Sequence, residues 1–166
     1  MSDFRLNTDF FRRLSAIQNP AFLNRMVGQA GVIAVNFSKE RFVQKNWLDE
    51  NPQSWQARKR ESRGSLLVVS GRLKRSIRKV EQGSFYVKIG TDVPYAQIHN
   101  EGGNINKTVT VRSHTRTRRN GRQNVQSHSR RMNLTMPKRQ FLGNSKTLGV
   151  RIETHLSRMI DGELNR

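Results

Sequence analysis

The residues best suited to chemistry gather in "VPYAQIHNEGG", residues 93–103. His99 follows Tyr95 by four positions and precedes the acid Glu101 by two. A histidine beside a carboxylate is the arrangement of a general base. Residues this close in sequence, however, rarely face the same way. We therefore expect no catalysis from this pair.

An architectural role fits this segment better. Tyr95 and Ile98 would pack one helical turn against a sheet, with residues 95–100 forming that turn. Gly102 and Gly103 would let the chain reverse direction, because glycine adopts backbone angles that other residues avoid. His99 would then form a hydrogen bond with the backbone.

Other catalytic and metal-binding patterns do not occur in the sequence. It has no cysteine, and no G-x-S-x-G, H-E-x-x-H, phosphate-loop or dinucleotide motif. His114 and His128 could face each other across a hairpin, but two ligands make a weak metal site. No acid lies between Glu101 and Glu153, which leaves few carboxylates to share a cleft. We expect a protein that is not an enzyme, with no catalytic residue, no metal and no cofactor.

Composition points to a basic protein of about one domain. The chain has 166 residues, 34% of them hydrophobic, and 31 Lys and Arg against 12 Asp and Glu, a net charge of +19. Such a balance favours a polyanionic or acidic partner. No run of about 18 apolar residues exists, so we expect no membrane span. The first residues lack the apolar block of a secretory signal.

Two helices are predicted near the N-terminus. Thr8 can cap a short one. Asn19 as cap and Pro20 at the first position begin a long one. Apolar residues then recur every three or four positions, which extends this helix to about Val43.

The next segments indicate a mixture of short elements. Trp47 and Trp55 stand in a polar stretch and are expected to anchor a loop on the core. Ser70 can cap a short helix. Residues 82–84 form a turn, and the alternation in "FYVKIG", residues 85–90, predicts a half-buried strand. The apolar stripe of the short helix would be Leu73, Ile77 and Val80, and the inner face of the strand Phe85, Val87 and Ile89.

Residues 104–135 differ from the rest of the chain in being polar and basic. Their composition allows a disordered loop, but Asn120-Gly121 is a strong signal for a type I′ hairpin turn. We favour a long β-hairpin arm, which needs a neighbouring surface because it has little apolar area. Its basic residues, taken as a candidate interaction surface, are Lys107, Arg112, Arg116, Arg118, Arg119, Arg122, Arg130 and Arg131.

The segment "MPKRQFLG" closes the arm. Phe141 and Leu142 are expected to return the chain to the core. A final helix begins at about Ser145. Its apolar side would carry Leu148, Ile152, Leu156, Met159 and Ile160.

Taken in order over roughly residues 20–160, these segments resemble the phage virion morphogenesis family, the tail-completion and head–tail joining proteins of tailed bacteriophages. The motifs are L-x-x-S-G-x-L-x-x-S-I, V-x-I-G-T, Y-A-x-I-H-x-x-G and P-x-R-x-F-L-G, after a long helix and a tryptophan-containing stretch. The matching residues include Ser70, Gly71, Leu73, Tyr95, Ala96, His99, Gly102, Pro137, Arg139, Phe141, Leu142 and Gly143.

The resemblance implies an α+β fold, with a long N-terminal helix and a C-terminal helix packed on a small antiparallel sheet. Residues 1–166 would be one tail-completion-like domain, and residues 104–135 its extended basic β-hairpin arm. That arm departs from the shorter, less basic insertion common in the family.

The resemblance also implies a structural, non-catalytic virion protein of the phage neck, located at the head–tail interface and, during assembly, in the host cytoplasm. Its partners would be other copies of itself in a ring, for which a hexamer is the guess. They would also include the phage head–tail connector and tail-tube proteins, and packaged DNA is a possible further contact. No membrane is expected to be involved. The alternative function is a basic nucleic-acid-binding protein. The charge supports it, but residues 104–135 contain no Phe, Tyr or Trp on which bases could stack.

Overall fold

The protein has an α+β fold, as expected. The structure is a computed structural model that describes residues 15–59, 63–119 and 121–165; the helix predicted after Thr8 lies largely outside them. In chain order, the elements are α2 (Pro20–Gln44), β1 (Asn46–Leu48), β2 (Pro52–Ser54), α3 (Arg72–Ser76), β3 (Arg78–Gln82), β4 (Val87–Gly90), α4 (Ala96–Glu101), β5 (Gly103–Val111), β6 (His114–Arg118), β7 (Gly121–Val125), β8 (His128–Met136) and α5 (Lys146–Leu164).

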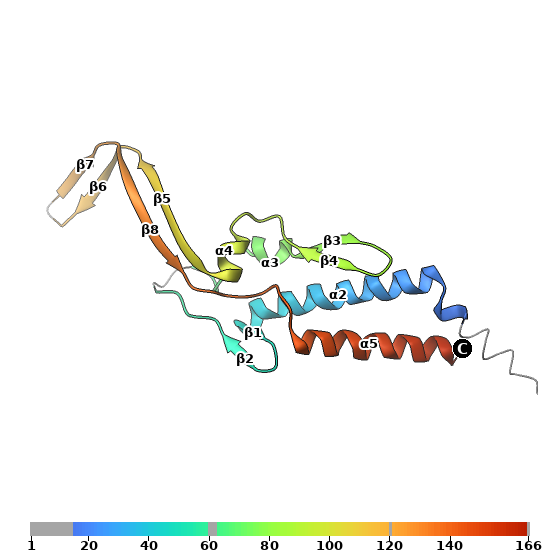
Figure 1. The fold of residues 1–166 in the computed structure, drawn as a ribbon. Helices are drawn as coiled ribbons and strands as arrows, with labels where there is room; N and C mark the ends of the chain where they lie inside the picture. The colour runs from blue at the N-terminus through green and yellow to red at the C-terminus, as the bar shows by residue number, and fades with distance from the viewer. Residues whose placement is uncertain (1–14, 60–62, 120, 166) are drawn as a thin grey trace, which may run out of the picture.

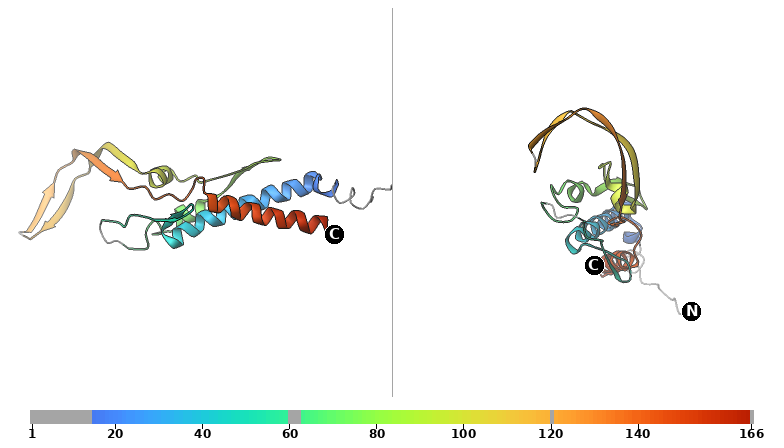
Figure 2. Two further views of the ribbon diagram at one scale, coloured as in Figure 1. Left: turned by 60° about the horizontal axis from the view of Figure 1, so that its bottom comes forward. Right: turned by 90° about the vertical axis from the view of Figure 1, so that its left-hand side faces the viewer.

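The strands form antiparallel pairs rather than one continuous sheet. The two-stranded pairs are β1–β2, β3–β4, β5–β8 and β6–β7. Helix α2 runs between the β3–β4 hairpin and α5, and packs against both (Figure 1). The α2 helix therefore forms the centre of the body, and the β5–β8 and β6–β7 pairs extend away from it (Figures 1 and 2).

Helix α2 has the predicted start and nearly the predicted end. The side chain of Asn19 accepts a hydrogen bond from the Ala21 amide at 2.9 Å, and Pro20 occupies the first turn. Lys45 ends the helix in the left-handed conformation, and its amide donates to the Arg41 carbonyl at 2.8 Å. The buried residues include Phe22, Gly31, Ala34, Phe37 and Phe42.

Helix α5 begins where the sequence predicted. The Ser145 hydroxyl accepts from the Leu148 amide at 3.1 Å and donates to the Leu48 carbonyl at 2.8 Å, so one side chain caps the helix and ties it to β1. The predicted apolar stripe is half-buried, and no α5 residue is fully buried. The ion pairs Arg25–Glu163 (3.1 Å) and Arg151–Glu40 (2.9 Å) join α5 to α2.

The predicted helix after Ser70 is shorter than expected. Its cap position is Gly71, with φ of +72°, although the Ser70 hydroxyl accepts from the Arg72 amide at 3.3 Å. Leu73 and Ile77 are buried as predicted. Val80 does not continue their stripe, because residues 78–82 pair with β4 instead; its side chain is 58% exposed.

The strand predicted over residues 85–90 begins at Val87. The Gly83 amide donates to the Tyr86 carbonyl at 2.9 Å and closes the predicted turn. Phe85 therefore lies in the turn, 81% exposed, rather than on the inner face of a strand. Val87 and Ile89 are half-buried, in agreement with the alternation.

The core gathers residues from segments far apart in the sequence. Its buried members are Phe42, Trp55, Leu73, Ile77, Val93, Ala96 and Phe141. The Phe42 ring lies 5.5 Å from Trp55 in an edge-on arrangement and 5.0 Å from Phe141. Trp47 is also buried and meets Phe37 edge-on at 5.8 Å. Both tryptophans therefore anchor their loop, as predicted.

Replacing Phe141 by Ala should lower the free energy of unfolding by about 3–5 kcal/mol, because the side chain is 0% exposed and its loss leaves a cavity. Chemical denaturation measures the change. Val150→Ala is the control on exposed α5 surface and should change stability by less than about 0.5 kcal/mol. A loss below about 1 kcal/mol for Phe141→Ala would show that the core is not organised around this ring.

Candidate functional site

The arm consists of two hairpin segments joined end to end. The first, which we call the stem, is the β5–β8 ladder, from Gly103 opposite Met136 to Val111 opposite His128. The second, the tip, is the β6–β7 ladder, from His114 opposite Val125 to Arg118 opposite Gly121. The hairpin prediction for residues 104–135 is thus confirmed. In the right-hand view of Figure 2 the arm curves away from the body in an arch.

Both strands are interrupted at the same level, between stem and tip. Neither residues 112–113 nor residues 126–127 belong to a strand. At each break a histidine Nδ1 lies 2.9 Å from the carbonyl oxygen two residues earlier: His114 on Arg112, and His128 on Gln126. Equivalent local hydrogen bonds therefore mark the bend on both strands.

The two arm histidines do not lie opposite each other. His114 pairs with Val125, and His128 with Val111. Among the described residues, no group of three or more His, Asp or Glu side chains could hold a metal ion. The predicted turn also shifts. Arg118 pairs with Gly121, so Gly121, with φ of +111°, is a strand residue rather than a central turn residue. Asn120 lies outside the described residues.

All eight basic residues of the arm are exposed. Within the described part of the chain, none of them forms an ion pair with a carboxylate. The nearest acids in sequence are Glu101 and Glu153, outside the arm on either side. The arm is therefore a concentrated positive charge with no compensation of its own.

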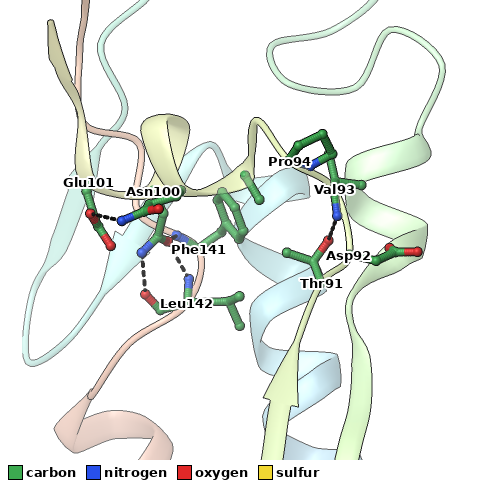
Figure 3. Close-up of a pocket in the computed structure, with 10 residues that line it drawn as sticks. Thr91, Asp92, Val93, Pro94, Asn100, Glu101, Phe141 and Leu142 are labelled. Atoms are coloured by element: carbon green, nitrogen blue, oxygen red, sulfur yellow. Dashed lines mark hydrogen bonds between the residues drawn. The ribbon is translucent and has the colours of Figure 1, made fainter. Parts of the chain in front are cut away.

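The base of the arm is closed by the side chain of Asn100, at the end of α4 (Figure 3). Its Oδ1 accepts from the amides of Phe141 and Leu142, both at 2.9 Å, and its Nδ2 donates to the Leu142 carbonyl at 3.0 Å. The side-chain amide of Asn100 thus binds the backbone of the segment that returns from the arm. Asn100 is not predictable from the sequence, since a single asparagine near a helix end gives no distinguishing signal.

Arg139 makes a second connection at the base. Its amide donates to the His99 carbonyl at 2.8 Å. Its buried guanidinium donates from Nε to the Gln56 carbonyl at 2.9 Å and from Nη2 to the Ala57 carbonyl at 3.4 Å. Nearby, Trp55 Nε1 donates to the Gln140 carbonyl at 2.9 Å. The Y-A-x-I-H-x-x-G motif, the P-x-R-x-F-L-G motif and the tryptophan loop therefore meet at one place.

Gly102 is required where the chain enters the arm. Its φ is +75°, and a Cβ there would lie 2.8 Å from the Lys138 amide nitrogen. The return segment passes too close for any other residue. Elsewhere in the motifs, Ala96 is buried, and Pro137 and Leu142 are half-buried. Gly143 has φ of +153°.

Several motif residues meet in a depression on the body. Its lining includes Ser70, Gly71, Leu73, Tyr95 and His99. The Tyr95 ring meets His99 edge-on at 5.9 Å. The prediction that the His99 side chain forms a hydrogen bond with the backbone is wrong for its Nδ1 atom. This atom is buried and has no partner in the described part of the chain. Glu101 accepts a hydrogen bond from the Gln97 side chain at 3.2 Å.

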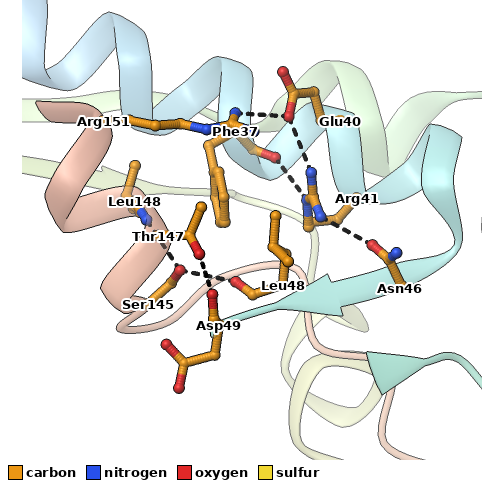
Figure 4. Close-up of polar contacts among 10 residues, drawn as sticks. All are labelled: Phe37, Glu40, Arg41, Asn46, Leu48, Asp49, Ser145, Thr147, Leu148 and Arg151. Atoms are coloured by element: carbon orange, nitrogen blue, oxygen red, sulfur yellow. Dashed lines mark hydrogen bonds and ion pairs between the residues drawn. The ribbon is translucent and has the colours of Figure 1, made fainter. Parts of the chain in front are cut away.

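A buried arginine, Arg41, stands in a cluster of polar contacts near the end of α2 (Figure 4). Arg41 donates to the Phe37 carbonyl (3.3 Å), the Asn46 side chain (2.9 Å) and Glu40 (3.0 Å). Burial raises the pKa of Glu40, but hydrogen bonds and positive charge from Arg151 and Arg41 outweigh it and hold this pKa below 4.5. The cluster joins α2, β1 and α5.

Comparison with family models matches residues 12–161 to the phage virion morphogenesis family. The chain belongs to this family. Comparison with curated proteins and with solved structures gave no significant match. The resemblance seen in the sequence is therefore confirmed over nearly the whole chain.

Membership of the virion morphogenesis family assigns the protein a role in building the phage particle and implies contacts with other virion proteins. In the described residues, no helix is long and apolar enough to cross a membrane. The family motif residues lie in the body, mostly at the base of the arm, and the arm itself carries eight exposed basic residues.

Replacing Asn100 by Ala should lower the free energy of unfolding by about 2–3 kcal/mol, because two amides and one carbonyl lose their partner. Chemical denaturation again measures this. The exposed Asn144→Ala is the matched control, with an expected change within about 0.5 kcal/mol. Equal effects of the two substitutions would contradict the assignment of Asn100 as the closure of the arm.

The folded protein should lose stability as the pH falls below about 6.5 because of His99. Burial, and then the charge of Arg139, lower the pKa of its imidazole from 6.5, so the unfolded chain takes up a proton first. His99→Gln should therefore flatten the dependence of unfolding free energy on pH between 7 and 5, measured by urea titration. His155→Gln, at an exposed position on α5, is the control. An unchanged slope in His99→Gln would show that this imidazole is not the group responsible.

Proposed function

We propose that this protein is a non-catalytic structural subunit of the phage neck that joins head to tail. The observation that carries the proposal is the arm, a ribbon that leaves the body, bears eight cations and contains no acid. A two-stranded ribbon with little apolar area is only marginally stable by itself, and contact with another molecule stabilises it.

A ring of identical subunits suits this architecture. The stem and tip are two-stranded, so each has two outer edges with backbone groups free for pairing with another chain. In a closed ring, every subunit presents its arm in the same direction. The arms together would then form a circle of positive charge around the head–tail joint. We expect six subunits in the ring.

Nucleic-acid binding is the second candidate, because eight exposed cations favour any polyanion. Sedimentation of the purified protein with duplex DNA, at low and physiological salt, distinguishes the two. Binding that persists at physiological salt would favour the second candidate. Weak binding lost with added salt is expected from charge alone.

Deleting residues 106–134 and bridging the gap with a short Gly-Ser linker should leave a folded body, because the core residues all lie outside the arm. In infected cells, heads and tails should accumulate separately, and joined particles counted by electron microscopy should fall at least about tenfold. Melting of the purified variant is the control for folding. A normal yield of infectious particles from a stably folded variant would refute the proposed function.

A further inference from the structure

The two faces of the stem differ in chemistry. Successive residues of a strand point to opposite faces, and residues opposite each other in the ladder share a face. One face therefore carries only Asn, Thr and Ser residues apart from Arg131. The other carries every large apolar residue of the stem, which are Ile105, Val109, Val111, Met132, Leu134 and Met136.

Cations are interleaved with these apolar residues on the same face. Lys107 lies opposite Met132, and Arg130 lies opposite Val109. We call this surface the docking face. Leu134 on it is 45% exposed, and no described helix or strand of the body packs along the stem. Apolar residues placed on one side of a ribbon without a covering layer mark a contact surface.

The body of a second copy fits this face poorly. Without the arm's eight cations, the chain keeps 23 of its 31 Lys and Arg against 12 acids, a net charge of +11. The acids Glu40, Glu50, Glu81, Asp92 and Glu163 already form ion pairs within their own subunit. Placing the arm on such a body would add like charge to like charge.

Duplex DNA also fits this face poorly. Phosphates would satisfy Lys107 and Arg130, but they would leave the apolar side chains beside them without a partner. A protein surface with an apolar strip bordered by carboxylates satisfies both kinds of residue at once.

We propose that the docking face of the stem binds an acidic, apolar strip on a different virion protein. The inference rests on the proposed function and names the partner for its arm. Burial of the apolar residues supplies the affinity, while Lys107 and Arg130 pair with carboxylates and fix the orientation.

Neighbouring arginines on opposite faces provide the test. Arg130→Glu reverses a charge on the docking face, and Arg131→Glu makes the same change on the polar face. Joined particles counted by electron microscopy should fall at least about tenfold for Arg130→Glu and stay within about twofold of wild type for Arg131→Glu. Equal losses would indicate non-specific attraction to a polyanion, and no loss in either would show that the docking face is not used; both results overturn the proposal.

A photo-reactive side chain identifies the partner in assembled particles. Placed at Val109, on the docking face, it should give a covalent product with a different virion protein after irradiation. Placed at Thr110, on the polar face, it should give several-fold less. A product with a second copy or with DNA, or no product from particles that contain the variant, overturns the proposal. If deleting the arm blocks joining but these results fail, only this inference is wrong; if the deletion is harmless, the proposed function fails as well.

Discussion

The closure of the arm at its base is the constraint on which the rest of the structure depends. The arm makes no core of its own, so both of its ends must be held by the body. Asn100 binds the returning backbone through three hydrogen bonds, and the side chain of Phe141, in the same segment, is buried in the core. Gly102 lets the departing strand pass within contact distance of the returning one. The family motifs gather mostly at this place because the connection leaves little freedom.

The body and the arm divide the charge of the protein between two roles. In the described part of the body, five acids are paired with bases, and the pairs Arg151–Glu40 and Arg25–Glu163 join the two long helices. In the arm, every basic residue stands exposed and without a carboxylate among the described residues. The body thus presents an arm whose positive charges have no carboxylate partners among the described residues. Such an arrangement suits a subunit that meets its partner during assembly of the particle.

Elements with strong local signals were predictable from the sequence. The Asn19-Pro20 start, the Ser145 cap and the Gly102 stop each depend on one or two residues with a definite backbone preference, and all three are found. Long-range pairing caused the errors. Val80 was assigned to a helix because its spacing fits one, but strand pairing with β4 prevails there. Asn100 could not be recognised, since its partners Phe141 and Leu142 lie in a distant segment of the chain. The two faces of the stem follow from alternation only once the register is known.

The central claim is that the arm is a docking element of the phage neck, covered by another protein in the finished particle. A cryo-electron microscopy reconstruction of the head–tail joint of the phage that encodes this chain tests it most directly. The account predicts the body in a ring at the joint, with the docking face of each stem buried against a different protein. A reconstruction in which the chain lies elsewhere, or in which the stems stand uncovered in solvent, would contradict it.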